Sequence, residues 1–496
     1  MKRIIYIAVC LLSVLNACRK DRGGPVKVVS PQAAAADEFA ADVLGSWYLW
    51  SDEIAGSLDR LTPDTCTTPI AVVREIRYHE NGKEVDRWTS LMEDLEAFSQ
   101  SIQGLGVTYG YDLQYGKIAN QAGAYFLLVT YVAKDTPAQK AGLKRGDILI
   151  SINGNVITKD NINEAFSSRS ITLEVTELVR DPSSGGYVIS SDRKSVSMTA
   201  VDMYEDPILL TRTFDAGGKR VGYLVYNGFD VRSAQALVDS CQKLKSAGIE
   251  ELILDLRYNG GGFMYTTNVL ASLLAPMANV EAEDVFQVEI FNKALTAQID
   301  PQSLVSRFST THPYYERESL LFTVDVSAAN PGIRKLYALV SEGSASASEG
   351  LLVGLAPYLD IVTIGTRTHG KYCGGYLLAP DEFYTKDYYQ QNLSKFSLIE
   401  KWGIYVMVSK FADRDGKNAA EPDGILPDIA VTDNPFDGYP LGDENETLLK
   451  AALIAAGKTY TRADGSSRPV YVRTERLHRK PNILIHNRKP VEFKQP

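Results

Sequence analysis

Ser346 and Lys371 are the two side chains whose types and spacing could carry out chemistry together. Ser346 begins the motif Ser-Ala-Ser-Glu, between a predicted strand at 336–340 and a predicted helix that starts near Glu349. A serine at such a turn stands clear of the sheet, beside free backbone N–H groups that can stabilise a developing oxyanion. The motif also fits a capping box with Ser346 at N-cap and Glu349 at N3, and taken alone it favours that structural interpretation.

Lys371 is separated from Ser346 by one predicted helix and one predicted strand, the length of chain needed to leave a sheet edge and return to it. Lysine can accept the serine proton only when it is neutral, so its pKa must fall from ~10.4 towards ~7–8. Burial lowers the pKa of a lysine, and the apolar strand predicted at 359–365 would provide that burial. His369 is a competing base, because on an extended segment it would point the same way as Lys371.

A glycine-rich loop follows another predicted strand. Strands at 221–225 and 252–256 alternate with helices at 233–247 and 264–274, which is the pattern of a parallel βαβ sheet. Between the second strand and its helix, residues 255–262 read Asp-Leu-Arg-Tyr-Asn-Gly-Gly-Gly. Consecutive glycines let backbone amides approach a ligand closely. The loop is not a phosphate loop, because no Gly-Lys-Ser/Thr follows it.

An earlier segment has the pattern of a peptide-binding domain. Residues 137–154 resemble the signature of PDZ domains, with a short helix, a Gly-Asp-x-Ile-Leu strand and an Asn-Gly turn. In PDZ-like folds a glycine-rich loop presents backbone N–H groups to the terminal carboxylate of a peptide, which adds as a strand to the sheet edge. The matching positions are Gly104, Leu105 and Gly106. The alternative is a structural turn in a domain that binds nothing.

Together these segments resemble the carboxyl-terminal processing, or tail-specific, serine proteases over roughly residues 100–430. The Ser-Ala-Ser-Glu motif, the Thr-His-Gly-Lys loop at 368–371, the glycine-rich loop and the PDZ-like region match the family pattern, as does Gly-Ile-Leu-Pro-Asp at 424–428. The resemblance implies an α/β fold: a Clp-protease/crotonase-like peptidase core, an inserted or preceding PDZ-like β-rich domain, and a small N-terminal helical domain.

The resemblance also implies roles for individual residues. Ser346 would be the nucleophile and Lys371, rather than His369, its base. The backbone amides of Gly261 and Ala347 would form the oxyanion hole, with Glu349 and Gly370 supporting the site. Two positions depart from the family pattern: Gly375 stands where a glutamine often orients the lysine, and Tyr372 replaces a glycine. The sequence therefore does not identify the residue that orients the base.

The N-terminus predicts export. Lys2 and Arg3 precede an apolar run at 4–15, which has the character of a signal-peptide core rather than of a membrane span. The run ends in Leu-Asn-Ala-Cys, which resembles a bacterial lipoprotein processing box and makes Cys18 the expected lipidation site. Two or more acyl chains would anchor the protein to a bacterial envelope membrane, on its periplasmic or cell-surface side. The alternative is an ordinary secretory signal.

The predicted segments, in chain order, are a lipoprotein signal peptide at 1–18, a tether at 19–33, an N-terminal helical domain at 34–102, a PDZ-like domain at 103–202, a peptidase core at 203–440, and a C-terminal helix with a basic tail at 441–496. Within the N-terminal domain we expect helices around 39–50 and 88–98 and a hairpin at 75–84. For the tail we expect a solvated hairpin with basic edges.

Composition excludes several other classes of function. The net charge of −9 argues against a general nucleic-acid partner. The cysteines beyond the signal peptide are scattered and lack metal-ligand spacing, and no cofactor is implied. The sequence predicts a serine endopeptidase that cleaves exported polypeptides through an acyl-enzyme and selects them by their C-termini. The alternatives are a catalytically silent PDZ-type adaptor on a protease fold, and a crotonase-like acyl-transfer enzyme.

Overall fold

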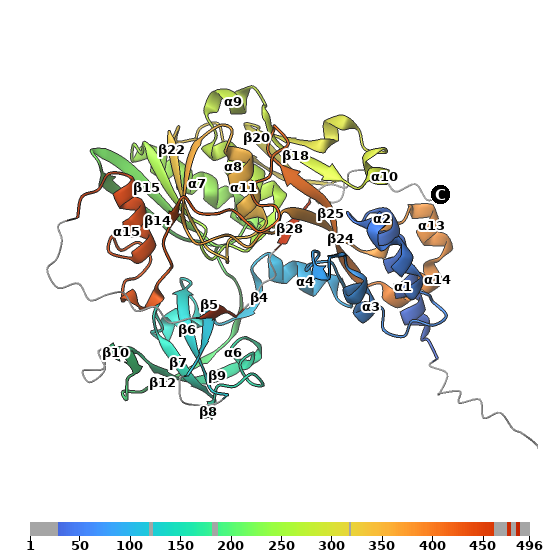
Figure 1. Ribbon diagram of the computed structural model, residues 1–496, viewed down its shortest axis with the longest axis horizontal. Coiled ribbons are helices and arrows are strands. Elements are labelled where there is room, and N and C mark those ends of the chain that lie inside the picture. Colours follow the sequence, from blue (N-terminus) through green and yellow to red (C-terminus); the bar gives the residue numbers. More distant parts are fainter. Residues whose placement is uncertain are drawn as a thin grey trace, which may run out of the picture.

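The computed structural model describes residues 28–118, 123–180, 187–316, 319–460, 474–477 and 483–486. The predicted signal peptide, the predicted lipidation site Cys18 and most of the predicted tether lie outside the described residues. Within the described ranges, no helix combines the length and the apolar character needed to cross a membrane. Figure 1 shows the PDZ-like β-rich part below a larger α/β core, with the N-terminal helices against one flank of that core.

The N-terminal segment is mainly helical and packs against the core. Its helices are α1 (Pro31–Ser46), α2 (Ser51–Ile54), α3 (Pro69–Ile76) and α4 (Leu95–Ile102). The apolar side chains of α1 join the same hydrophobic cluster as the core strands, so the helices do not form a core of their own.

The hairpin predicted at 75–84 is confirmed at its turn but is shorter than predicted, because Glu75 and Ile76 belong to α3. Strands β1 (His79–Glu80) and β2 (Lys83–Glu84) flank an Asn-Gly turn whose two residues have positive φ, as a two-residue hairpin turn requires. The helix predicted at 88–98 is wrong in its first half, where β3 (Ser90–Met92) pairs with another strand. The helix starts only after Asp94, because this side chain accepts a hydrogen bond from the Ala97 amide and caps α4.

The PDZ-like part is an antiparallel sheet with its own apolar core. Its strand order is β12 (Lys194–Thr199), β9 (Ser170–Thr176), β7 (Ile148–Ile152), β6 (Tyr125–Val132), β5 (Tyr111–Lys117) and β27 (Glu475–Arg476), with β8 (Asn155–Val156) on β7. The short helices α5 (Pro137–Lys140) and α6 (Glu164–Ser167) and the hairpin of β10 (Leu178–Arg180) and β11 (Tyr187–Ile189) complete it. Strands β4 (Leu105–Thr108) and β13 (Val201–Tyr204) pair with each other where the chain enters and leaves this part.

The α/β core is built on a six-stranded sheet. Its order is β14 (Ile208–Ala216), β15 (Lys219–Tyr226), β16 (Glu251–Asp255), β22 (Lys335–Val340), β23 (Asp360–Gly365) and β26 (Ile429–Ala430), parallel from β15 onward. Alternate side chains of these strands face opposite sides. One set packs with α7 (Ala234–Ser246), α8 (Met264–Leu274) and α11 (Ala347–Leu355), and the other packs with α15 (Thr447–Ala455). The predicted βαβ pattern and the α/β fold class are therefore confirmed.

A second sheet closes the core beside the glycine-rich loop. Its order is β17 (Gly261–Phe263), β28 (Ile483–Ile485), β24 (Cys373–Leu378), β25 (Gly403–Ala412), β18 (Val285–Phe291) and β19 (Val305–Arg307), with β3 on β25. Around it lie α9 (Met277–Glu281), α10 (Lys293–Thr296), the hairpin of β20 (Thr311–Glu316) and β21 (Ser319–Asp325), and the short helices α12 (Pro380–Phe383), α13 (Lys386–Gln391) and α14 (Leu393–Phe396).

The predicted C-terminal hairpin is wrong for the described residues. The two tail strands, β27 and β28, do not pair with each other. Each instead pairs with a strand far away in sequence, β27 with β5 of the PDZ-like sheet and β28 with β17 and β24 of the core. Backbone pairing with existing sheet edges satisfies donors and acceptors that a solvated hairpin would leave open on its outer sides.

Candidate active site

Ser346 lies at the junction of β22 and α11, as predicted, in a strained conformation. Its φ of 61° and ψ of −109° lie in a region that residues other than glycine rarely adopt. The residue is fully buried, and its hydroxyl oxygen has no hydrogen-bond partner among the described residues. Such strain persists only where the surrounding structure enforces it, and it concentrates at functional sites.

The Glu349 carboxylate joins the turn of Ser346 to the loop of Lys371. One of its oxygens, Oε2, accepts hydrogen bonds from the backbone amides of Ser346 at 2.8 Å and Lys371 at 2.9 Å. The other, Oε1, accepts from Thr368 Oγ1 at 2.5 Å and from the Gly370 amide at 2.7 Å. The turn of Ser346 and the loop of Lys371, which are separated in sequence by α11 and β23, are thus both held by the same buried side chain. The structure brings together both members of the predicted dyad and both predicted supporting residues.

Lys371 has the environment of a base that is neutral near pH 7. Its side chain is fully buried, and this burial lowers its pKa to about 7. Its Nζ donates a hydrogen bond to the Tyr405 hydroxyl at 2.9 Å. It also lies 5.1 Å from the centroid of the Trp88 ring and 4.9 Å from that of Tyr405. The two aromatic rings exclude water from the amine while attracting its charged form.

Tyr405 and Trp88 are site residues that sequence reasoning missed. Tyr405 lies on β25, one strand away from the lysine, and Trp88 precedes β3 at the edge of the same sheet. Their hydroxyl and ring contacts orient Lys371, whereas Gly375, at the position where the family often has glutamine, has no side chain that could do so. No local motif marks either residue, because only the pairing of distant strands brings them to the lysine.

His369 is less well placed as a base. The prediction that it points the same way as Lys371 assumed an extended segment, but Gly370 between them has a φ of 80°. The His369 amide donates to the carbonyl of Ser344 at 3.0 Å, and its imidazole lies against Trp88 with 6.3 Å between ring centroids. The residue is half-buried, whereas Lys371 is fully buried. The geometry therefore favours Lys371.

The glycine-rich loop docks directly on the turn of the serine. The carbonyl of Asn259 accepts hydrogen bonds from the Ala345 amide at 3.1 Å and from Ser348 Oγ at 2.9 Å. Beside it, the Gly261 amide donates to Asn259 Oδ1 at 2.9 Å. The Gly261 amide is therefore already engaged, contrary to the expectation that it faces a substrate oxygen.

Two other amides are better placed to serve as oxyanion donors. Within the described parts of the chain, the backbone N–H groups of Ala347 and Gly260 have no acceptor. Ala347 was expected in this role, and Gly260 replaces Gly261 as the candidate second donor. The side chain of Asn259 explains the change, because it folds back and caps the amide two residues later.

The predicted carboxylate-binding residues are not in an open loop. Leu105 and Gly106 belong to β4 and pair with Tyr204 and Met203 of β13. The Gly104 carbonyl accepts from the Glu205 amide at 3.0 Å, which extends this ladder by one residue. Strand pairing commits much of this segment's backbone, so its binding of a peptide carboxylate stays a prediction.

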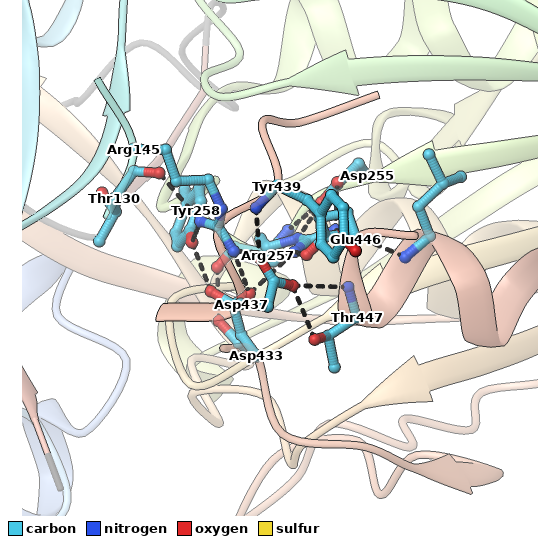
Figure 2. Close-up of polar contacts among 12 residues, drawn as sticks. Thr130, Arg145, Asp255, Arg257, Tyr258, Asp433, Asp437, Tyr439, Glu446 and Thr447 are labelled. Atoms are coloured by element: carbon cyan, nitrogen blue, oxygen red, sulfur yellow. Dashed lines mark hydrogen bonds and ion pairs between the residues drawn. The ribbon is translucent and has the colours of Figure 1, made fainter. Parts of the chain in front are cut away.

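A buried ionic cluster links the PDZ-like part to the glycine-rich loop (Figure 2). Arg145, from the turn before β7, and Arg257, from the glycine-rich loop, converge on Asp433 and Glu446. Arg257 donates to Asp433 Oδ1 at 2.9 Å and to Glu446 Oε1 at 2.6 Å. The facing cations lower the pKa values of both carboxyls. The cluster thereby fixes the position of the loop that carries Gly260, one of the two candidate oxyanion donors.

Replacing Glu349 by alanine should both destabilise the fold and impair the site. The change leaves three buried amides and one hydroxyl without their charged acceptor. We expect the unfolding free energy to fall by about 3 kcal/mol, measured by urea titration. Glu342→Ala, at an exposed position four residues before Ser346, is the matched control and should leave stability nearly unchanged. Equal stability of the two variants would contradict the role assigned to Glu349.

The fold combines an α/β core, which carries the candidate Ser346/Lys371 site, with an attached PDZ-like domain. Residues 220–431 match the family model of peptidase family S41, and residues 128–176 match that of the PDZ domain. Over these residues the matches confirm the resemblance predicted from the sequence, that to the C-terminal processing serine proteases.

Individual relatives agree with this assignment. The carboxy-terminal processing protease CtpA of Bacillus subtilis (strain 168) is 23% identical over 277 residues, which cover 56% of this chain and 48% of that protein. A protein assigned as a CtpA-like serine protease in Staphylococcus epidermidis (strain ATCC 12228 / FDA PCI 1200) is 23% identical over 364 residues, covering 72% of this chain and 59% of that protein. The chain thus spans between about half and three fifths of the length of these two relatives.

A solved structure shares the fold. A protein of Bacteroides fragilis NCTC 9343 assigned to the S41 proteases superposes with a TM-score of 0.63 and 21% identity, covering 84% of this chain and 96% of the other.

Proposed function

We propose that this chain is a serine endopeptidase of the C-terminal processing type, with Ser346 as nucleophile and Lys371 as base. The observation that carries the proposal is the Glu349 carboxylate, which accepts hydrogen bonds from the amides of both residues. The lowered pKa of Lys371, about 7, supports it, because a neutral amine can accept a proton near physiological pH. The Ser/Lys roles and the acyl-enzyme are parts of this proposal.

The reaction would begin with transfer of the Ser346 hydroxyl proton to Lys371 Nζ as Oγ attacks the scissile carbonyl carbon. In the structure Nζ donates to Tyr405, and the amine can keep that hydrogen bond while its lone pair turns to accept the hydrogen bond of the Ser346 hydroxyl. The amides of Ala347 and Gly260 would donate to the oxyanion. The carbon–nitrogen bond then breaks, and Lys371 returns the proton to the leaving amine. Water, deprotonated by the same lysine, would then attack the acyl carbon; the bond from that carbon to Oγ breaks, and Lys371 returns the proton to Oγ.

Covalent labelling tests the proposal against both alternatives. A fluorophosphonate probe should modify Ser346 in the wild-type chain, identified by mass spectrometry of the labelled peptide, and should not label Ser346→Ala. Peptide binding without labelling or turnover would favour the silent adaptor. Labelling accompanied by hydrolysis of acyl thioesters but not of polypeptides would favour an acyl-transfer enzyme.

The rate of cleavage should rise with pH through about 7. Lys371 must be neutral to act, and its pKa of about 7 in the folded chain places half of the molecules in the active form near that pH. We therefore expect single-turnover acylation to increase about tenfold per pH unit below 6 and to level off above 8. A rate independent of pH between 5 and 9 would contradict Lys371 as the base.

The proposed substrates are exported polypeptides, reached from a lipid anchor at Cys18. This proposal rests on the signal-like N-terminus and on the processing box that ends in that cysteine. We expect Cys18→Ser to move the protein from the membrane fraction to the soluble exported fraction, measured by ultracentrifugation and immunoblotting. If the variant stays as membrane-bound as wild type, the anchor lies elsewhere.

A further inference from the structure

The described C-terminal tail, residues 474–477 and 483–486, contacts two sheet edges at once. The first contact is with the PDZ-like sheet, where β27 pairs antiparallel with β5 at the end of the strand order. Glu475 pairs with Tyr115 and Arg476 with Gln114, and the Leu477 amide donates to the Leu113 carbonyl at 3.1 Å. Addition of an extended strand at a sheet edge is the way PDZ domains bind peptides. The tail therefore pairs with this edge in the manner of a PDZ peptide ligand.

Side chains strengthen this first contact. Leu477 is buried in the apolar core of the PDZ-like part. The Arg476 guanidinium reaches in the other direction, donating to the carbonyls of Gly343 at 3.1 Å and Tyr258 at 2.8 Å. Gly343 belongs to the turn before Ser346 and Tyr258 to the glycine-rich loop. One tail residue thus bridges the PDZ-like edge and both loops of the candidate active site.

The second contact is in the second sheet of the core, beside the loop of Lys371. Strand β28 lies between β17 and β24 and runs parallel to both. Strand β17 contains Gly261, next to the candidate oxyanion donor, and β24 begins two residues after Lys371. Without β28, these two strands would present open edges to each other, and an extended peptide placed between them would lie beside the dyad.

The backbone of Leu484 is linked to the proposed base through one side chain. The Tyr405 hydroxyl donates to the Leu484 carbonyl at 2.8 Å and accepts from its amide at 3.2 Å. The same hydroxyl accepts the hydrogen bond of Lys371 Nζ. The tail thereby stabilises the arrangement in which Lys371 contacts Tyr405, while the Ser346 hydroxyl has no partner among the described residues.

His486 anchors the end of this strand in a pocket of the core. Its imidazole stacks on Tyr376 with 4.8 Å between ring centroids. Its Nδ1 lies 2.9 Å from Glu289 Oε1, and its Nε2 lies 3.0 Å from Ser409 Oγ. The pocket continues into a cavity of about 420 Å³ that Glu289, Tyr376 and His486 help to line. Its carboxylate and aromatic wall suit a basic or aromatic side chain.

We propose that the C-terminal tail is an autoinhibitory segment that occupies, in cis, the peptide edge of the PDZ-like part and the substrate slot between β17 and β24. The proposal rests on the proposed function, because the slot is assigned to substrate through the Ser346/Lys371 site. A tethered segment binds at a high effective concentration, on the order of mM for a short connection, so weak contacts suffice to hold it. Substrates would be polypeptides whose extended segments replace the tail, with an aliphatic side chain at the PDZ-like edge and a basic or aromatic one at the Glu289 pocket.

Reversible removal of the tail tests this proposal in the full chain. A recognition sequence for a site-specific protease, inserted within residues 461–473, allows the folded protein to be cut and the tail fragment to be separated by size exclusion. We expect cleavage of an unrelated peptide substrate to increase at least about tenfold after removal of the tail, and a synthetic peptide of residues 471–496 to restore inhibition. The same peptide carrying Arg476→Ala and His486→Ala should inhibit about tenfold more weakly.

Binding of the tail is measured separately from turnover, so that failure of the proposed peptidase function can be distinguished from failure of the inhibitory role. Fluorescence anisotropy with a labelled 471–496 peptide on the cut Ser346→Ala chain should show saturable binding that is weakened by the two substitutions. Binding without turnover in any form would refute the peptidase assignment, and inhibition with it. Binding combined with unchanged turnover after removal would overturn the inhibitory role and leave β27 and β28 as structural strands.

Two further outcomes would also overturn the proposal. Absence of peptide binding to a cut chain whose melting curve is unchanged would show that the tail contacts are not specific. Mass spectrometry of the intact chains gives the second outcome. If the wild-type chain lost its tail and Ser346→Ala kept it, the tail would be a substrate of the site rather than its inhibitor.

Discussion

Lys371→Met and Lys371→Arg should each reduce peptide cleavage by about 10⁴-fold or more, as far as Ser346→Ala does, because a nucleophile and its base act as one unit. Methionine retains the length and apolar character of the side chain but has no basic nitrogen. Arginine retains the charge but does not deprotonate in proteins. The measurement is single-turnover cleavage of a fluorogenic peptide, using the chain from which the tail has been removed.

Stability measurements separate loss of the base from loss of the fold. The pKa of Lys371 falls from 10.5 to about 7 on folding, so the buried amine disfavours the folded state increasingly as pH falls from 10.5 to 7. Lys371→Met removes this cost and should therefore melt at a higher temperature than wild type at pH 7. Lys410→Met and His369→Ala are controls and should keep most of the activity; Lys410 is a half-buried residue on β25 whose amine pairs with Glu421. If His369→Ala abolished cleavage while Lys371→Met cleaved normally, the Ser/Lys assignment would be wrong.

Arg257→Met should lower the unfolding free energy by about 3 kcal/mol, because it leaves the buried Asp255 without its counter-ion and leaves Asp433 and Glu446 with Arg145 alone. The Arg257 guanidinium is 1% exposed and donates to Asp255, Asp433 and Glu446. Turnover should fall as well, since the cluster positions the glycine-rich loop. Arg334→Met is the matched control. The Arg334 side chain is 74% exposed and pairs with Glu250, and loss of such an exposed ion pair should lower the unfolding free energy by only about 0–1 kcal/mol.

The pH dependence of this loss provides a second readout. The pKa values of Asp433 and Glu446 are lowered in the folded chain, that of Asp433 to about 2. These carboxylates therefore stabilise the fold at pH values above the pKa of the unfolded chain, and this contribution is lost as the pH falls through the pKa of the folded chain. The stability difference between wild type and Arg257→Met should therefore be largest near neutral pH and shrink between pH ~5 and ~2. A difference that is constant over this range would show that packing, rather than charge, determines it.

The sequence by itself determined the order of the core elements and the candidate nucleophile. Short apolar runs bounded by turn formers located β15, β16, β22 and β23 to within a residue or two, because strands buried on both faces carry such runs. The helix predicted at 264–274 coincides with α8. Local chemistry sufficed in each case, including the pairing of Ser346 with Glu349 in the turn.

Only the tertiary structure decided which groups meet at the site. Tyr405 and Trp88 come to Lys371 through strand pairing across the second sheet, and their side chains, rather than a neighbour of Lys371 in sequence, orient its amine. The engagement of the Gly261 amide by Asn259 is equally invisible in the motif, because it depends on a side-chain rotamer. These contacts join residues far apart in the chain or depend on conformation, and neither is encoded in local spacing.

The tail shows the same division most clearly. Its short basic and apolar stretches fit a solvated hairpin equally well, since local pattern specifies that a segment is extended but not which edge it joins. The open edges of β5, β17 and β24 exist only once three separate parts of the chain have folded. Pairing with those edges satisfies the backbone donors and acceptors of β27 and β28, and this non-local hydrogen bonding, rather than residue type, places the tail at the candidate active site.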